Sequence, residues 1–134
     1  MLPPKRTKYR KSQKGRSKGI QSNNFKIHCA RYKIISLSTA RLRASTIEAV
    51  RRVITRKLKR MGSVSVKVHP SVSVTEKPLE VRMGKGKGAV AYWICRIKKG
   101  QVLYEIDGVD FSKVQAACLL ADAKLPIKTK FYWK

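Results

Sequence analysis

The amino-acid sequence predicts an α+β fold, in which one compact domain combines mixed or antiparallel strands with two main helices and carries a basic extended arm at its N-terminus. The length of 134 residues suits a single domain with one core, and the hydrophobic fraction of 43% is that of a folded protein. Segments of helical period and segments of strand period both occur, and they do not alternate regularly as βαβ units do. We expect residues 1–20 to form the arm and residues 21–134 to form the globular domain.

The arm is defined by its charge. From Met1 to Thr46 the sequence has no acidic residue, and two prolines and two glycines before residue 20 argue against a continuous helix. A solvated disordered tail and an organelle import sequence are alternatives, but like-charge blocks of this kind are typical of arms that order on nucleic acid. The cations that we expect to bind RNA or DNA are Lys5, Arg6, Lys8, Arg10, Lys11, Lys14, Arg16 and Lys18.

The strongest predicted helix spans residues 45–62 and follows an extended segment at residues 25–37. Ser45 and Glu48 have the spacing of a capping box, and Gly62 supplies a stop. One face of this helix is apolar and is expected to pack on the core: Ile47, Val50, Ile54, Leu58 and Met61. The opposite face is basic and is expected to contact phosphates: Arg52, Arg56, Lys59 and Arg60, with Arg51 and Lys57 on the flanks.

The remaining elements are shorter. Residues 63–69 alternate valine with polar residues and predict a half-buried strand that is broken at Pro70. Further along, the sequence predicts a strand at 89–97, a turn at 98–100, a hairpin partner for that strand at 101–106, a helix at about 112–124 and a closing strand within 124–133.

The segment before residue 89 predicts a protruding loop at 75–89 that binds phosphate. Its functional part consists of Arg82, Met83, Gly84, Lys85, Gly86, Lys87 and Gly88. Glycines let backbone amides approach an anion, and the lysines add positive charge. The spacing from Gly84 to Ala89 resembles a dinucleotide fingerprint, but an aromatic strand follows in place of the required helix. No Walker A sequence occurs either, so a nucleic-acid backbone is the expected partner.

The composition excludes several other classes of protein. There are 32 Lys and Arg against 7 Asp and Glu, a formal charge of +25 that calls for a polyanionic partner. No apolar run approaches 18 residues, so we expect no membrane. Cys29, Cys95 and Cys118 form no CxxC pair and are expected to be small buried hydrophobes. A zinc site with His28 and His69 matches no ligand motif, and no set of catalytic groups is recognisable. We therefore expect no metal, no cofactor and no enzyme activity.

Several stretches together carry a family resemblance. They are PPKRTKYRK and QKGR in the arm, IEAVRRVITRKLKR in the helix, TEKPLEVRMGKGKG followed by YW at the loop, VLYEIDGV, and AKLPIKTKF near the C-terminus. The chain resembles the L-sixteen proteins of the large ribosomal subunit in bacterial-type ribosomes. The resemblance covers nearly the whole chain, and the loop motif is its most specific part.

The resemblance implies a hammerhead-like α+β fold and a place on large-subunit ribosomal RNA beneath the aminoacyl-tRNA site. It implies that the loop around Arg82 reaches toward the peptidyl transferase centre, where the protein orders RNA and helps to position tRNA while the RNA performs catalysis. The implied partners are ribosomal RNA, tRNA and neighbouring ribosomal proteins, with no membrane and no homo-oligomer. The implied RNA-binding residues are the cations of the arm together with Arg51, Arg52, Arg56, Lys59 and Arg60.

Departures from the family pattern bear on localisation. Residues 20–44 lack the glycine-rich run of bacterial members, and Ala91 replaces a common glutamate. These changes and the ending FSKVQAACLLADAK favour a mitochondrial ribosome, and the bacterial-like start would fit synthesis inside the organelle; plastid and bacterial ribosomes are the alternatives. The rival function is that of a general basic nucleic-acid-packaging protein, which should bind duplex DNA as readily as structured RNA.

Overall fold

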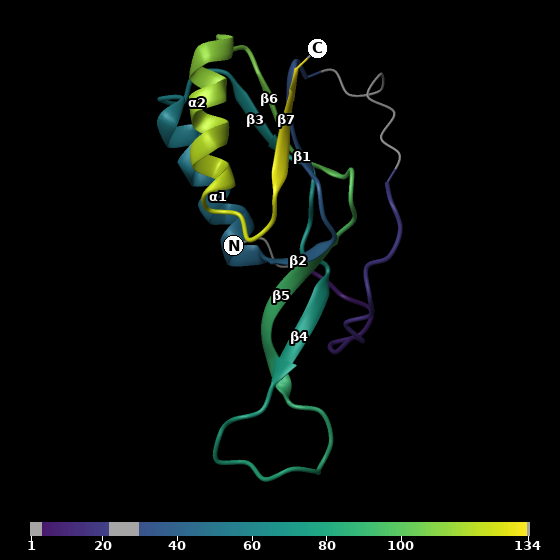
Figure 1. The fold of residues 1–134 in the computed structure, drawn as a ribbon. Helices are drawn as coiled ribbons and strands as arrows, with labels where there is room; N and C mark the ends of the chain where they lie inside the picture. The colour runs from purple at the N-terminus through teal and green to yellow at the C-terminus, as the bar shows by residue number, and fades with distance from the viewer. Residues whose placement is uncertain (1–3, 22–29, 134) are drawn as a thin grey trace.

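The computed structural model describes residues 4–21 and 30–133, which form one domain of two helices and two antiparallel sheets (Figure 1). This architecture confirms the α+β prediction. The elements in chain order are β1 (Tyr32–Ser36), β2 (Ala40–Arg43), α1 (Ala44–Lys57), β3 (Ser63–Val66), β4 (Val72–Glu76), β5 (Ala89–Ile97), β6 (Val102–Asp107), α2 (Phe111–Asp122) and β7 (Thr129–Trp133).

The strands are divided between a four-stranded sheet, β3-β6-β1-β7, and a three-stranded sheet, β2-β5-β4. Figure 1 shows the two helices against the four-stranded sheet, with the β4–β5 hairpin extending away from that body. The predicted hairpin between β5 and β6 is wrong, because β5 pairs with β2 and β4 whereas β6 pairs with β1 and β3. The backbone N–H of Gly100 donates to the Ser36 carbonyl at 2.8 Å, and that of Ser36 donates to the Gln101 carbonyl at 2.9 Å. These bonds attach the chain after β5 to β1 and so carry it into the other sheet.

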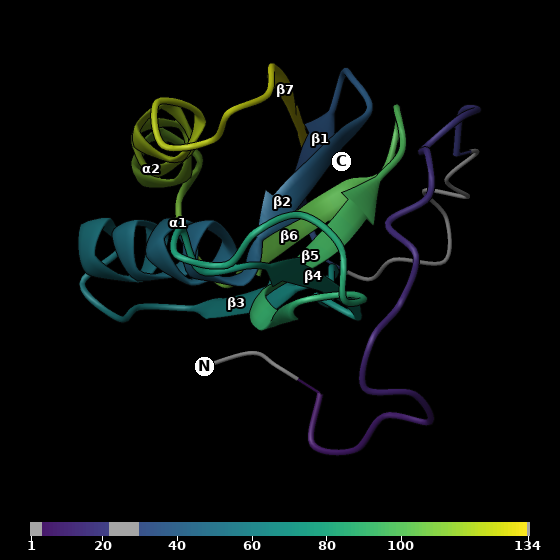
Figure 2. The same ribbon diagram turned by 90° about the horizontal axis from the view of Figure 1, so that it is seen from below.

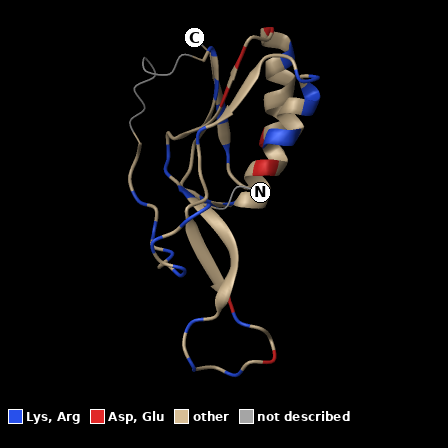
Figure 3. Ribbon diagram, turned by 180° about the vertical axis from the view of Figure 1, so that it is seen from behind, with Lys and Arg blue, Asp and Glu red and all other residues tan. Residues whose placement is uncertain are grey.

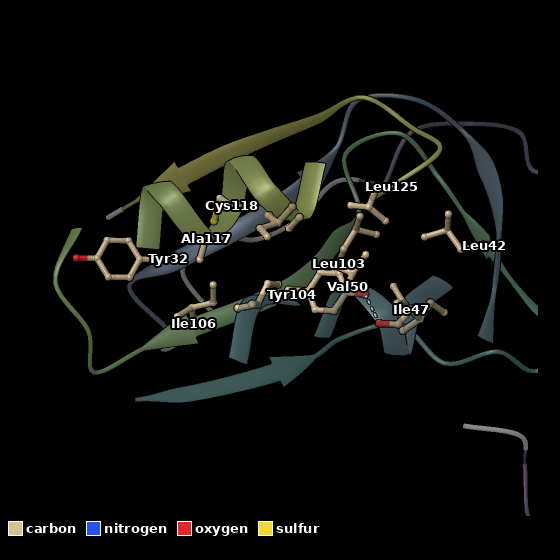
Figure 4. Close-up of a cluster of buried hydrophobic side chains, with 14 of the residues drawn as sticks. Tyr32, Leu42, Ile47, Val50, Leu103, Tyr104, Ile106, Ala117, Cys118 and Leu125 are labelled. Carbon is tan, nitrogen blue, oxygen red and sulfur yellow. Dashed lines mark hydrogen bonds between the residues drawn. The ribbon is translucent and has the colours of Figure 1, made fainter. Parts of the chain in front are cut away.

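The core lies between the four-stranded sheet and the helices. Ile47, Val50, Ile54 and Leu58 of the predicted apolar face are fully buried, and they pack with Leu103 and Tyr104 of β6 (Figure 4). Met61, the last residue assigned to that face, is 44% exposed because it lies beyond the end of the helix. The core therefore contains the residues of the predicted apolar face up to Leu58, and Met61 lies outside it.

One hydrogen bond fixes α1 to the sheet. The buried Tyr104 hydroxyl donates to the Ile47 carbonyl at 2.8 Å, and burial raises the pKa of Tyr104 well above its usual value. Tyr104→Phe keeps the ring and removes this bond, so we expect it to lower the free energy of unfolding by about 1–2 kcal/mol in urea titrations. Tyr9→Phe, at an exposed arm position, is the control and should leave it unchanged. Equal stability of Tyr104→Phe and the unsubstituted protein would show that this bond contributes nothing.

The predicted N-terminal cap of the helix is wrong. Arg43 is the N-cap residue and makes no side-chain capping bond, and Ser45 lies within the first turn. The cause is that β2 runs into α1 without a loop, so the last strand residue occupies the cap position. Glu48 has no capping role and instead pairs with arginines on the helix surface.

The predicted stop at Gly62 is also wrong. The helix ends at Lys57, with Leu58 as its C-cap. Lys59 and Arg60 then adopt left-handed backbone conformations, with φ of 51° and 64°. The turn after α1 is thus made by two basic residues, which leaves them outside the helix on which the sequence analysis placed them.

The other predicted elements are confirmed with adjusted bounds. β1 lies inside the predicted extended segment 25–37, of which residues 25–29 lie outside the described residues. The strand predicted at 63–69 is confirmed as β3, and after Pro70 the chain forms β4, which the sequence analysis did not assign. α2, β5 and β7 correspond to the helix at 112–124, the strand at 89–97 and the closing strand.

The cysteine prediction is confirmed where it can be assessed. Cys95 and Cys118 are free and buried, and burial raises the pKa of the Cys118 thiol to about 12. Cys29 and His28 lie outside the described residues. Among residues 4–21 and 30–133, no group of His, Cys, Asp or Glu side chains is arranged to hold a metal ion. No helix in this part of the chain is long and apolar enough to cross a bilayer.

Candidate nucleic-acid interface

A basic surface covers the outer side of α1 and the turn that follows it. Arg52 and Arg56 are exposed because the helical period places them opposite the buried residues of α1. The left-handed turn then brings Lys59 and Arg60 back to the same shallow hollow. We call this the α1 basic surface; it is lined by Arg51, Arg52, Thr55, Arg56, Lys59 and Arg60. Figure 3 shows the positions of Lys and Arg along this helix in blue. The predicted cations are therefore gathered in one place, although two of them lie outside the helix.

Glu48 sits at the edge of this surface and holds Arg51. The Arg51 guanidinium donates twice to the Glu48 carboxylate, at 2.6 and 3.0 Å, and Arg52 Nε donates to it at 3.1 Å. The hydrogen bond from Arg51 is the main cause that lowers the pKa of Glu48 to about 2. Arg51 is half-buried, whereas the Arg52 side chain is 72% exposed. Arg52 thus remains open to a further anion, and Arg51 is committed largely to Glu48.

The Glu48 ion pair predicts a pH dependence of stability. Because folding lowers the pKa of this carboxyl, its contribution is complete above the unfolded value of about 4.3 and is lost as the pH falls toward 2. Glu48→Gln should therefore unfold more easily than the unsubstituted protein near neutral pH, by at most about 1 kcal/mol for this partly exposed pair. The difference should shrink in urea titrations as the pH is lowered through this range. Glu80→Gln, at an exposed position, is the control; a Glu48→Gln difference that does not change with pH would contradict the assignment.

The loop between β4 and β5, residues 77–88, extends away from both sheets (Figure 1). Arg82 and Lys85 are exposed there, and the apolar Leu79 and Met83 are almost completely exposed as well. The loop has one acid, Glu80, and an excess of exposed cations. Exposed cations beside exposed apolar side chains are suited to a partner that offers both phosphates and flat apolar surfaces, such as folded RNA.

The glycines of this loop have two different physical roles. Gly84 and Gly86 have φ of 94° and 82°, and Lys85 between them has φ of 55°, so the backbone is left-handed over three consecutive residues. Gly88 instead lies against the end of β4, where an added Cβ would approach the Glu76 carbonyl oxygen to 2.4 Å. The first two glycines set the path of the loop and the third closes its base.

The arm lies along the three-stranded sheet and is joined to the base of the loop. The Ser12 hydroxyl accepts a hydrogen bond from the Ser73 N–H of β4 at 3.2 Å. Lys87 Nζ donates to the Ser12 carbonyl at 2.7 Å, and Lys11 Nζ donates to the Lys87 carbonyl at 2.6 Å. These bonds link residues more than 60 positions apart, so no local sequence pattern could have revealed them. The eight predicted cations of the arm are all exposed.

Three exposed cations at the three-stranded sheet were not predicted from the sequence. Arg41 of β2 lies directly opposite Arg96 of β5, and Lys98 follows the end of β5. All three are exposed. The alternation of buried and basic residues in ARLR and in CRIK was the signal available, but a basic residue on the solvent side of a strand is common and was given no role.

The α1 basic surface, the basic arm and the loop between β4 and β5 together define a protein that binds nucleic acid. The particular class follows from comparison with known proteins: the chain belongs to the family described as Ribosomal protein L16p/L10e, whose family model matches residues 4–132.

Individual relatives agree with this assignment. The chain is 53% identical over 131 residues to the large ribosomal subunit protein uL16m of Prototheca wickerhamii, covering 98% of this chain and 97% of that protein. It is 50% identical over 134 residues to uL16 of Buchnera aphidicola subsp. Acyrthosiphon kondoi, covering 100% and 98%. It is 50% identical over 131 residues to uL16 of Allorhizobium ampelinum, covering 98% and 96%.

The family assignment confirms the resemblance found in the sequence. The chain is a structural constituent of the large ribosomal subunit of the bacterial type, and it is not an enzyme. Membership implies association with large-subunit ribosomal RNA and with other ribosomal proteins.

Proposed function

We propose that the chain anchors itself on large-subunit ribosomal RNA through the α1 basic surface and the arm, and that its β4–β5 loop helps to position tRNA near the peptidyl transferase centre. The observation that carries this proposal is the convergence of Arg52, Arg56, Lys59 and Arg60 on one hollow. No acid lines this hollow, and Glu48 at its edge is held by Arg51. A surface of this kind gains affinity when its cations neutralise RNA phosphates and release the counterions condensed on the RNA.

The proposal divides the chain into three working parts. Residues 1–20 act as the RNA-binding arm, residues 21–134 as the globular domain, and residues 75–89 as a protruding loop. The contacts among Lys11, Ser12 and Lys87 support a coupling of two of these parts, because they attach the arm to the base of the loop. RNA that orders the arm would then also orient the loop.

The tRNA-proximal residues are proposed to be Arg82, Met83, Gly84, Lys85, Gly86, Lys87 and Gly88. In this group Arg82 and Lys85 carry the charges at the exposed part of the loop. The ammonium group of Lys87 donates to Ser12 and therefore belongs to the attachment of the arm. The RNA-binding arm residues are proposed to be the eight exposed cations from Lys5 to Lys18.

We further propose that the chain works as a single copy in a mitochondrial ribosome. The mitochondrial relative from Prototheca wickerhamii is 53% identical, against 50% for the bacterial relatives named above. This margin is narrow, so plastid and bacterial ribosomes are the alternatives to be distinguished by experiment.

Sedimentation tests the proposed function. Tagged chain from a cell lysate is centrifuged through a gradient at high salt, and the RNA that accompanies it is sequenced. Co-migration with the large subunit is expected, and the source of the recovered RNA identifies the compartment. Recovery with bulk DNA would instead favour the packaging function, and recovery as free protein would contradict RNA anchoring altogether.

A further inference from the structure

The arm and the end of β5 enclose a second basic hollow, which the α1 basic surface does not include. We call it the arm–β5 cleft; its lining includes Arg16, Ser17, Lys18, Ser71, Arg96 and Lys98. Within the described part of the chain, the lining contributes four cations and no carboxylate. Cations held together in this way repel one another unless an anion lies between them.

The strand register beneath the cleft adds to this repulsion. Arg41 and Arg96 are directly opposite in the β2–β5 pair, an arrangement of like charges that destabilises a sheet. Both converge on Gly15: Arg41 Nη2 donates to the Gly15 carbonyl at 2.6 Å, and an added Cβ on Gly15 would lie 2.6 Å from Arg96 Nη1. The glycine thus allows the arm to lie against two arginines, where a residue with a side chain would push Arg96 away.

A third observation points to a ligand with acceptor oxygens. The Ser17 hydroxyl is buried and has no hydrogen-bond partner among the described residues. Buried hydroxyl groups in folded proteins are almost always hydrogen-bonded, because an unsatisfied one costs free energy. A ligand bound in the cleft would satisfy this hydroxyl and offset the charges of the surrounding cations.

We propose that the arm–β5 cleft binds a phosphate group of an RNA backbone, and that it does so independently of the α1 basic surface. Phosphodiester oxygens accept hydrogen bonds from arginine, lysine and hydroxyl donors, which are the groups that line the cleft. Figures 1 and 2 place α1 and the arm on opposite sides of the sheets. The chain therefore contacts two separate segments of RNA and ties them together. This inference rests on the proposed RNA-binding function.

Salt dependence of RNA binding tests the cleft. The probe is a transcript of bacterial-type large-subunit ribosomal RNA, and the variant is Arg96→Ala with Lys98→Ala. Since each engaged phosphate contributes about −0.7 to −0.9 to the slope of log affinity against log salt, we expect the slope to become shallower by about one unit. The matched control is Lys124→Ala with Lys128→Ala, which removes two exposed charges outside the cleft and should leave the slope nearly unchanged.

Ser17→Ala separates the ligand role of the hydroxyl from a structural one. Removing an unsatisfied buried hydroxyl should leave the thermal stability of the free protein unchanged or slightly higher. If the hydroxyl donates to a phosphate, the same variant should weaken RNA binding by about tenfold without changing the salt slope, because no charge is removed. A loss of stability in the free protein with unaltered RNA binding would overturn this role.

The outcomes distinguish the cleft from the proposed function. If Arg52→Ala with Arg56→Ala reduces the slope while the cleft variant behaves like its control, the cleft proposal fails and the function stands. If the unsubstituted protein itself shows no salt-dependent RNA binding, the proposed function fails. A third outcome is that a poly-glutamate peptide binds in place of RNA and that only the cleft variant loses this binding. That result would overturn the cleft proposal in favour of an acidic protein partner.

Discussion

Replacing Arg52 and Arg56 together with alanine is expected to weaken binding to large-subunit ribosomal RNA by about a hundredfold or more at low salt, as the loss of two charged hydrogen bonds would. Both side chains are exposed and adjoin Lys59 and Arg60 in one hollow, so each is placed to neutralise a phosphate. The slope of log affinity against log salt should become shallower by about 1.4–1.8 units if each arginine engages one phosphate. Filter-binding or fluorescence titrations over a range of salt concentrations measure both quantities.

Two matched variants control for the loss of charge. Lys124→Ala with Lys128→Ala removes the same charge from another exposed surface and should change the slope little. Arg52→Lys with Arg56→Lys keeps the charge but loses the planar donor geometry of arginine, so the slope should be retained while affinity falls. An unchanged slope in the alanine variant would exclude α1 from the RNA interface.

Replacing Arg82 and Lys85 with alanine is expected to impair tRNA binding while sparing the anchoring of the protein. Both residues are exposed in the loop that extends away from the α1 basic surface. Large subunits reconstituted with this variant should bind aminoacyl-tRNA about three- to tenfold more weakly, as expected for the loss of two partly solvated charge contacts. The salt slope for binding ribosomal RNA should remain that of the unsubstituted protein.

Lys87 is left in place in this experiment because its ammonium group holds the Ser12 carbonyl of the arm. Lys87→Ala would disturb the arm and the loop together, and its effect on tRNA could not be assigned to either. Normal tRNA binding by subunits that carry the Arg82→Ala and Lys85→Ala variant would refute a role of the loop in positioning tRNA.

The sequence predicted best those features that depend on local periodicity. The faces of α1 followed from the helical period, and Ile47, Val50 and Ile54 are buried as expected. The bounds of β5 agree with the predicted strand at 89–97, where apolar and aromatic residues are continuous from Ala89 to Cys95. The ends of α1 were wrong because they depend on the path of the chain: β2 supplies the start, and a left-handed turn at Lys59 and Arg60 supplies the end.

The partition of strands between two sheets could not be predicted from neighbouring residues. β5 and β6 are separated by a short turn that is compatible with a hairpin, but β6 pairs with β1 from Tyr32–Ile106 to Ile35–Val102, next to the bonds between Ser36 and the Gly100–Gln101 segment. The burial of β6 from Val102 to Ile106 fits its position between two other strands. These pairings depend on long-range contacts, for which one sequence gives no direct evidence.

In the candidate site, too, features that are visible in the local sequence were predicted, and features that depend on the fold were not. Charge and composition indicated the arm, α1 and the loop, because an excess of one sign is visible in the sequence. The arm–β5 cleft was not predicted, since it depends on the opposition of Arg41 and Arg96 and on the position of the arm against them. Its arm residues, 16–18, lie more than 50 positions from Ser71, Arg96 and Lys98, and the two groups come together only in the fold.

Tethered cleavage of RNA tests whether α1 anchors the chain on ribosomal RNA while the loop points toward tRNA. An iron chelate is attached at Arg56→Cys or at Lys85→Cys, each variant is assembled into large subunits with bound tRNA, and hydroxyl radicals are generated. The unsubstituted protein, in which Cys95 and Cys118 are buried, is the control. We expect cleavage of the peptidyl transferase region and of the tRNA acceptor end from position 85, and of a different ribosomal RNA segment from position 56. Cleavage no greater than the control, or cleavage of the tRNA acceptor end from position 56 and not from position 85, would contradict this expectation.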